Sequence, residues 1–204
     1  MISLRPALLA LALALAAAGC SMKPVHVDAM ETKIPQPGEL RRIEYPLFVI
    51  LDPAKLADSM TALGQGVKPI DVHGLHTFVQ RDLQRTMSQL FTSVIVAAPT
   101  TPAPQGIFLT GEVLVNSLSS FTGTRGPGTP SGVYVRMQWS FRIRAYGAPA
   151  DAFVYQGTAE STVPITSTRD TQPALQSLFE DGLRRLVTHY DTQRAYDRMA
   201  RIGQ

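Results

Sequence analysis

Apolar residues occur along this 204-residue chain in runs whose spacing changes from one region to the next. Residues 47–51 form a continuous apolar run between Pro46 and Asp52, which is typical of a strand buried on both faces. Residues 93–96 form a second such run. After a predicted loop at residues 64–69, Asp71 is placed to cap a helix whose apolar positions recur every three or four residues: Val72, Leu75, Val79, Leu83, Met87 and Leu90.

The middle of the chain has the two-residue period of strands. Apolar and polar residues alternate at residues 107–118 and again at residues 133–146. A turn at residues 147–151 follows, so residues 133–146 are predicted to form a hairpin with the strand after the turn. Placing Tyr146 opposite Ala152 keeps the apolar and polar faces of the two strands in agreement. That register puts Phe141 opposite Gly157, so that a ring covers a strand glycine. The apolar face of residues 133–146 consists of Val133, Val135, Met137, Trp139, Phe141 and Ile143.

A helix is predicted to close the chain. Pro173 stands in its first turn, and Gly182 lies within its apolar stripe, which indicates close approach to the sheet. The fold class is therefore α/β (α+β), a single mixed sheet of about five strands in the order β-α-β-β-β-α, with two helices packed on one face. The stripe consists of Leu175, Leu178, Phe179, Leu183, Leu186, Val187 and Tyr190.

The first twenty residues predict export. Arg5 precedes an apolar run at residues 7–18, which is shorter than the ~20 residues of a membrane-spanning helix and fits a signal peptide. The run ends in Ala17-Ala18-Gly19-Cys20, which resembles the bacterial lipobox. The resemblance implies cleavage before Cys20, which would carry a diacylglycerol and an N-acyl chain. An ordinary signal peptide with an incidental cysteine is the alternative.

Three segments follow from this interpretation: a signal peptide at residues 1–19, a lipidated N-terminus and flexible tether at residues 20–42, and one globular α/β domain at residues 43–204. The tether is polar and contains three prolines, Pro24, Pro35 and Pro37. In the lipoproteins that the motif resembles, a residue other than Asp after the cysteine directs the protein to the outer membrane. Ser21 therefore implies a periplasm-facing anchor in the outer membrane of a Gram-negative bacterium.

Composition narrows the classes of function. The chain is 45% hydrophobic and 17% charged, as in globular proteins. Its net charge of +3, which becomes +2 when Arg5 leaves with the signal peptide, comes from scattered residues and does not indicate a nucleic-acid partner. Cys20 is the single cysteine, so the domain has no disulfide, no thiol nucleophile and no thiolate metal site.

Two stretches carry a wider resemblance. Residues 78–96 read as a helix that ends just before a buried strand, and residues 133–159 read as a long hairpin with an aromatic-rich inner face. The combination resembles a group of envelope lipoproteins that share the α/β fold of the TolB amino-terminal domain, the curli secretion lipoprotein and the lipoprotein activators of penicillin-binding proteins. The proline-rich residues 99–106 replace a second helix that several members have, so the resemblance implies the fold more than the partner.

The candidate contact residues lie in two regions. Arg136, Arg142 and Arg144 share the polar face of one strand near Glu160. They suit acidic lipid head groups, lipopolysaccharide phosphates or the carboxylates of peptidoglycan, although such a stripe is more often a solvated sheet face. Residues 119–132 form a predicted glycine-rich loop that lacks the Lys-Ser/Thr pair of phosphate-binding loops. This loop is either a binding loop or a mobile connection. Within it, Phe121 and Arg125 are the residues to test.

No residue pattern predicts catalysis, a cofactor or a metal. His73 and His76 are three residues apart, but no third ligand has matching spacing. The nucleophile-elbow and zinc-protease motifs are absent from the sequence. We therefore expect a non-catalytic envelope protein that binds another envelope protein, peptidoglycan or lipopolysaccharide. The alternative is a lipid or glycan carrier, which requires an apolar cavity between sheet and closing helix; a hydrolase requires a perturbed acid/base pair in a cleft.

Overall fold

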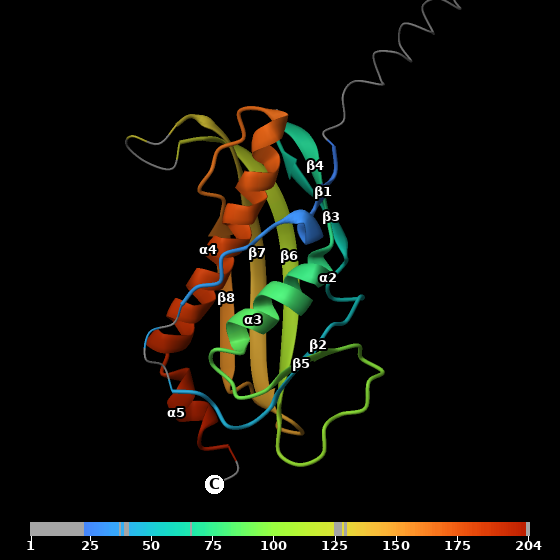
Figure 1. Cartoon of the computed structure of the whole chain (residues 1–204), viewed down its shortest axis with the longest axis vertical. Coiled ribbons are helices and arrows are strands. Elements are labelled where there is room, and N and C mark those ends of the chain that lie inside the picture. The colour runs from blue at the N-terminus through green and yellow to red at the C-terminus, as the bar shows by residue number, and fades with distance from the viewer. Residues whose placement is uncertain are drawn as a thin grey trace, which may run out of the picture.

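The computed structural model describes residues 23–36, 38, 41–65, 67–124, 128 and 130–202. One mixed sheet is covered by helices on one face and is open on the other (Figure 1). Its strands are β1 (Val25–His26), β2 (Leu47–Ile50), β3 (Ser59–Gly64), β4 (Val67–His73), β5 (Val94–Ala97), β6 (Leu109–Gly123), β7 (Gly132–Ala145) and β8 (Phe153–Glu160). The helices are η1 (Val27–Ala29), α2 (Leu75–Thr77), η2 (Phe78–Leu83), α3 (Gln84–Met87), η3 (Thr168–Asp170), α4 (Thr171–Thr192) and α5 (Ala195–Met199).

The long antiparallel hairpin of β6 and β7 is the centre of the sheet. Strand β8 continues it on the side of β7. The other edge of β6 is shared, because parallel β2 pairs with its residues 109–112 while β3 joins it farther along, where Leu63 is paired with Ser119. Two short groups, β2 with β5 and β3 with β4 and β1, therefore lie end to end along one strand. The predicted single mixed sheet with helices on one face is confirmed.

The sheet has eight strands in the described chain, more than the five expected. The difference lies partly in residues 59–73, which form the hairpin of β3 and β4 and not a loop followed by a helix. The sequence concealed this hairpin because only Ala62, Ile70 and Val72 of its residues are buried. Gly64 allows the hairpin to touch β6, because a Cβ at this position would clash with the carbonyl oxygen of Ser120.

The first helical segment begins later than predicted. Asp71 lies in β4 and its carboxylate accepts a 2.7 Å hydrogen bond from the Thr61 hydroxyl, so it is not the helix cap. The cap is Gly74, whose φ of 84° suits glycine and turns the chain from strand into helix. From there α2, the π-helical η2 and α3 follow one another and pack on the sheet through Leu75, Val79 and other apolar residues of the predicted stripe, joined by Phe78, which the prediction did not include.

The strand at residues 47–51 is confirmed as a buried strand. Strand β2 runs between β5 and β6, parallel to both. Leu47 and Val49 face the helices while Phe48 faces the opposite side, and all three are buried. Strand β5 corresponds to the second apolar run predicted at residues 93–96.

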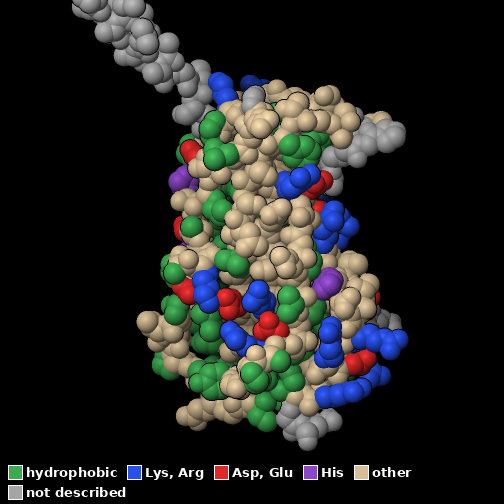
Figure 2. Space-filling model, turned by 180° about the vertical axis from the view of Figure 1, so that it is seen from behind, with side chains coloured by type: hydrophobic (Ala, Val, Ile, Leu, Met, Phe, Trp, Pro, Cys, Tyr) green, Lys and Arg blue, Asp and Glu red, His purple; other side chains and the backbone are tan. Residues whose placement is uncertain are grey.

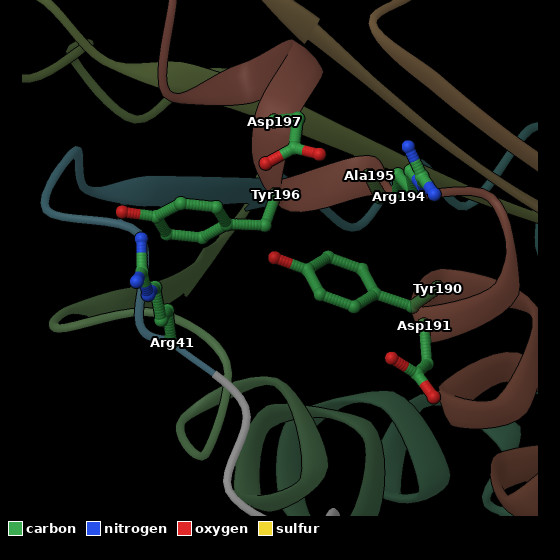
Figure 3. A pocket seen from close by; sticks show the side chains of 7 residues that line it. All are labelled: Arg41, Tyr190, Asp191, Arg194, Ala195, Tyr196 and Asp197. Carbon is green, nitrogen blue, oxygen red and sulfur yellow. The ribbon is translucent and has the colours of Figure 1, made fainter.

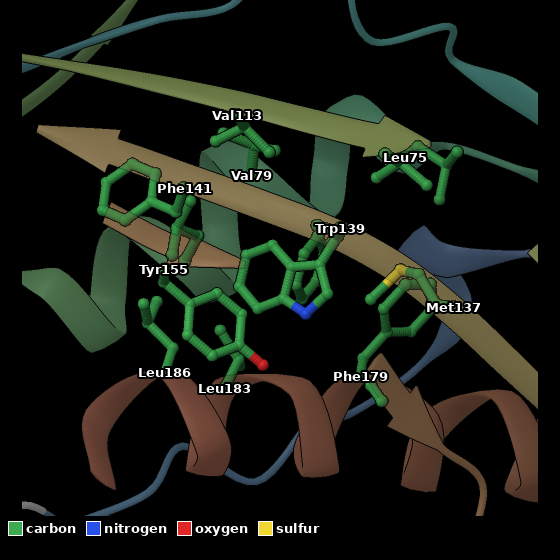
Figure 4. Close-up of a cluster of buried hydrophobic side chains, with 14 of the residues drawn as sticks. Leu75, Val79, Val113, Met137, Trp139, Phe141, Tyr155, Phe179, Leu183 and Leu186 are labelled. Atoms are coloured by element: carbon green, nitrogen blue, oxygen red, sulfur yellow. The ribbon is translucent and has the colours of Figure 1, made fainter. Parts of the chain in front are cut away.

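Aromatic and aliphatic side chains fill the space between the sheet and the helices. Trp139 and Phe141 of β7 are fully buried and lie between the sheet and α4 (Figure 4). The ring centroid of Phe78 lies 4.6 Å from that of Phe179 on α4. Gly182 is the point of close approach, as its spacing predicted: a Cβ there would lie 3.4 Å from the Cβ of Ala159 and from Nε1 of Trp139. Sheet and closing helix are thus in direct contact.

The faces of the β7–β8 hairpin are as predicted, but the predicted register is wrong by two residues. Trp139 is paired with Gly157, and Phe141 is paired with Tyr155. A shift of two preserves which side chains point inward, so polarity alone does not distinguish the two registers. Gly157 is covered by the ring of Tyr155, whose Oη would lie 2.5 Å from an added Cβ.

Part of the segment expected to be a flexible tether is packed against the domain. Val25 and His26 form β1, which pairs in parallel with Val72 and His73 of β4. Val27 and Met30 are buried, and the backbone N–H of Lys33 donates to the carboxylate of Glu180 on α4 at 2.9 Å. Residues 25–34 therefore pack against the folded domain, because Val25, Val27 and Met30 are buried in its core and Ile34 is partly buried against it.

Candidate partner-binding surface

The face of the sheet opposite the helices is open to solvent and carries the predicted arginines. Cross-strand pairing places Glu112 beside Arg142, Thr110 beside Arg144 and Ser119 beside Arg136. Charged side chains of both signs lie together over the lower half of this face, with hydrophobic side chains gathered at its lower left (Figure 2). The sheet thus brings together three of the predicted contact residues on one surface.

Ion pairs neutralise two of the three arginines. The guanidinium of Arg136 lies 2.7 Å from the carboxylate of Glu160 on β8. Arg144 lies 3.5 Å from Glu112, which also holds Lys55 at 2.9 Å. Arg142 is exposed and has no ion-pair partner within the part of the chain that the structure describes. It is consequently the arginine of this stripe whose charge is available to a partner.

An apolar patch adjoins these charges. Tyr146 is 66% exposed, Ile107 is 56% exposed and Ile95 is 42% exposed. Phe108 supports the patch from below: its ring is stacked on Tyr146 at a centroid distance of 4.5 Å and makes a T-shaped contact with Phe48 at 6.2 Å. Exposed apolar patches with a polar rim are typical of binding surfaces. We call Ile95, Ile107, Tyr146 and Arg142 the back-face patch; sequence reasoning missed its three apolar members because they lie in different segments.

Phe121 lies in strand β6 and not in a loop, because β6 and β7 extend as far as Gly123 and Gly132. Its ring is stacked on Tyr134 at 5.8 Å, and the guanidinium of Arg136 covers it at 4.7 Å. The predicted loop of residues 119–132 is accordingly much shorter. Two of the predicted site residues, Arg125 and Cys20, lie outside the described residues.

His73 and His76, which are three residues apart in the sequence, have separate surroundings. His73 is stacked on His26 at 5.3 Å, whereas a ring nitrogen of His76 is 2.8 Å from the carbonyl oxygen of Leu56. Among the described residues no group of three or more His, Cys, Asp and Glu side chains is placed to hold a metal ion. Within the same residues, no helix is both long and apolar enough to cross a membrane.

A hollow of about 240 Å³, lined by charged residues and two tyrosines, lies between α4, α5 and Arg41 (Figure 3). Tyr190 reaches into it from α4 and Tyr196 from α5, and Arg41 lies 6.0 Å from the Tyr196 ring centroid. Burial, together with the neighbouring Tyr196, raises the pKa of Tyr190, so its hydroxyl stays protonated. This arrangement offers hydrogen-bond donors but no nucleophile paired with a base, and it is not the apolar cavity that a lipid carrier requires.

The comparisons with known proteins bear on the fold. No family model matches the sequence, and no curated protein gives a significant match. A solved structure of a Xanthomonas campestris protein described with the family model DUF330 has a TM-score of 0.53 at 10% identity, over 85% of this chain and 96% of that one. At that identity the likeness shows a shared α/β fold and not a shared function.

Two weaker structural likenesses support no further statement. A minor lipoprotein from Acinetobacter baumannii has a TM-score of 0.40 at 14% identity, over 74% of this chain and 95% of that one. A homolog of a neuraminyllactose-binding hemagglutinin from Helicobacter pylori has a TM-score of 0.42 at 7% identity, over 83% of this chain and 95% of that one.

Proposed function

We propose that this chain is a bacterial envelope lipoprotein, anchored in the outer membrane through acyl chains on Cys20, that acts without catalysis by binding another envelope component. The observation that carries the proposal is the combination of a filled core with an exposed apolar patch on the open sheet face. A binding protein needs a rigid body and an accessible contact surface, and this fold supplies both.

The contact surface that we propose is the back-face patch. Ile95, Ile107 and Tyr146 supply apolar area, while the exposed Arg142 supplies a positive charge that forms no ion pair among the described residues. Tyr and Arg are the residues that most often dominate binding energy at protein interfaces. We therefore favour an envelope protein as the partner; peptidoglycan or lipopolysaccharide would be recognised mainly by the charge.

The rival function as a carrier receives less support. A carrier would hold a lipid or glycan between the sheet and the closing helix, and Trp139, Phe179 and Leu183 fill that space. Opening it would expose this core, whose burial stabilises the domain by about 2 kcal/mol or more for each large side chain. The filled interface therefore favours binding at the surface over enclosure.

The experiment that tests the contact surface is site-specific photo-crosslinking in whole cells. A photoreactive amino acid at position 107 or 146 of the full-length chain is expected to yield one and the same adduct. The same amino acid at position 85, exposed on α3 on the helical side, serves as the matched control and is expected to yield none. Absence of any adduct at 107 and 146, or equal adducts at 85, would contradict the proposed surface.

The anchor is tested separately. Cys20→Ser is expected to abolish labelling with palmitate and to release the protein from the membrane fraction, because Cys20 is the single cysteine of the chain. If the variant still sediments with membranes and still incorporates palmitate, the lipoprotein assignment fails.

A further inference from the structure

Strand β5 forms an outer edge of the sheet. It pairs in parallel with β2 and with no other strand in the described chain (Figure 1). The carbonyl oxygens of Ser93 and Ala97 accept hydrogen bonds from β2 at 2.9 and 2.8 Å, and in a parallel pair every second residue bonds to the same neighbour. The backbone groups of Val94 and Val96 therefore point away from β2.

Most of these outward backbone groups are unpaired. The side-chain amide of Gln84 on α3 donates a 3.0 Å hydrogen bond to the carbonyl oxygen of Val94, as the outward direction requires. The N–H of Val94 and both backbone groups of Val96 have no hydrogen-bond partner among the described residues. Val94 and Val96 are only partly buried, and Ile95 between them is 42% exposed. Free donors and acceptors along an accessible edge are a template for another strand.

The edge at β5 also lacks the protection that the opposite edge has. On β8, a ring nitrogen of His189 lies 3.0 Å from the carbonyl oxygen of Val154. The carboxylate of Asp181 accepts the N–H of Glu160 near the other end of β8. Edge strands are usually protected by such covering, by charged residues or by proline. Residues 93–98 read Ser-Val-Ile-Val-Ala-Ala and contain no charged residue and no proline.

An apolar row crosses the back of the sheet and ends at this edge. Ile95 is paired with Phe48 on β2, whose ring makes a T-shaped contact with Phe108 at 6.2 Å. Phe108 is in turn stacked on Tyr146 of the back-face patch at 4.5 Å. The hydrophobic side chains at the lower left of Figure 2 lie on the side of the sheet that β2 and β5 form. A strand added to β5 would place a side chain beside Ile95 and lengthen the row.

We propose that β5 receives an extended, uncharged segment of the partner protein as an additional strand, with an apolar side chain beside Ile95. The edge defines this chemistry, because its open groups pair with the backbone of any extended chain and its side chains are aliphatic. A four-residue strand is only ~13 Å long and cannot supply the ~800 Å² per partner of a stable interface. The same partner therefore also covers the back-face patch. This inference rests on the proposed function.

A second copy of this chain fits the observations less well. Two β5 strands that paired edge to edge and antiparallel, about a twofold axis, would extend one sheet sideways. The back faces of both copies would then lie on the same side of that sheet, and Ile107 and Tyr146 of each copy would stay uncovered. An extended segment of a different protein can pair with β5 while the rest of that protein covers the patch.

The test begins with photo-crosslinking in whole cells. A photoreactive amino acid at position 95, 107 or 146 of the full-length chain is expected to yield one and the same adduct. Val96→Pro removes an N–H that bonds to no described residue, so the fold is retained while strand addition is blocked. The adduct yield from position 146 is expected to fall by about tenfold in this variant. Val96→Thr retains the N–H and is expected to retain the yield.

The matched control is Gln156→Pro. Gln156 lies four residues before Glu160 on β8, so its N–H also points away from the sheet. This variant makes the same chemical change at the opposite edge and is expected to leave the adducts unchanged. Thermal unfolding of every variant establishes that it folds. Val94→Pro removes another outward N–H at the first position of β5, where proline is tolerated, and replaces Val96→Pro if that variant does not fold.

The outcomes separate this inference from the proposed function. Undiminished adducts in a folded proline variant of β5, or no adduct at position 95, would reject strand addition and leave the back-face patch as the contact surface. An adduct at position 95 with the mass of two copies of this chain would assign the edge to self-association and overturn the inference. Absence of adducts at positions 107 and 146 in the otherwise unaltered chain would reject the proposed contact surface as well.

Discussion

The carboxylate of Asp181 on α4 accepts a 3.0 Å hydrogen bond from the backbone N–H of Glu160 on β8. Asp181 is 2% exposed, and Arg184 and Arg185 on the next turn of the helix donate to its two oxygens. One buried anion therefore joins the closing helix α4 to the edge strand β8. The arginines remain partly exposed, so the charge is compensated without being fully removed from water.

This junction predicts a specific loss of stability. Asp181→Asn keeps the size of the side chain but removes the charge that Arg184, Arg185 and the Glu160 N–H all use. We expect the free energy of unfolding to fall by about 1–3 kcal/mol, measured by urea denaturation. Asp191→Asn, on the same helix but exposed and without such contacts, is the matched control and is expected to change stability little. Equal effects of the two substitutions would contradict the role of Asp181.

Gly182, the residue that follows Asp181, predicts a limit on the size of the side chain that its position can accept. An added Cβ would lie 3.4 Å from Ala159 and Trp139, which is ordinary contact, so Gly182→Ala fits and gains up to ~1 kcal/mol of helix propensity. Gly182→Leu has no such room and is expected to lose about 1–3 kcal/mol through overpacking. Thermal unfolding of the two variants beside the wild type measures the contrast. A wild-type-like leucine variant would show that α4 lies farther from the sheet.

The sequence predicted the parts of the fold in which burial follows a period. The inward face of β7 was identified because Trp139 and Phe141 are two residues apart, which is the period of a strand. The inward face of α4 was identified because Leu183 belongs to a stripe with helical spacing. The register of β7 with β8 was not, since moving Gly157 from Phe141 to Trp139 leaves every side chain on the same face. The register depends on which residues of the two strands are paired, and the polarity pattern excludes only shifts by an odd number of residues.

The back-face patch and the packed N-terminal segment were missed for a different physical reason. Val25, Val27 and Met30 are buried by contacts with elements far along the chain, among them β4, and they follow no regular spacing. Ile95, Ile107 and Tyr146 gather because the sheet places β5, the start of β6 and the end of β7 at one end. A sequence without an alignment of relatives carries no direct signal of such long-range neighbours.

Asp170 predicts a dependence of stability on pH. Hydrogen bonds from Thr166 and Ser167 lower the pKa of its carboxyl from 3.8 to about 2. The unfolded chain therefore takes up the proton first as the pH falls, and the stabilisation is present above the unfolded pKa and lost between roughly pH 4 and pH 2. We expect the difference in unfolding free energy between wild type and Asp170→Asn to be constant near neutral pH and to shrink over that window. A difference that persists unchanged at pH 2 would show that the charge is not responsible.

Substitutions of Arg136 and Arg142, which lie on the same strand, are expected to affect different properties: the first lowers stability and the second weakens binding. Arg136 is paired with Glu160 and covers Phe121, so Arg136→Gln removes two contacts and is expected to cost up to about 1 kcal/mol of stability. Arg142 has no such partner in the described chain, so Arg142→Gln is expected to leave stability unchanged. Its charge lies on the same face of the sheet as the apolar residues of the back-face patch, four residues from Tyr146 along the chain, and its removal is expected to weaken the photo-crosslink from position 146. Urea denaturation and crosslink yield, measured on both variants, separate the two effects. An undiminished yield in Arg142→Gln would remove Arg142 from the contact surface and leave its apolar residues to be tested alone.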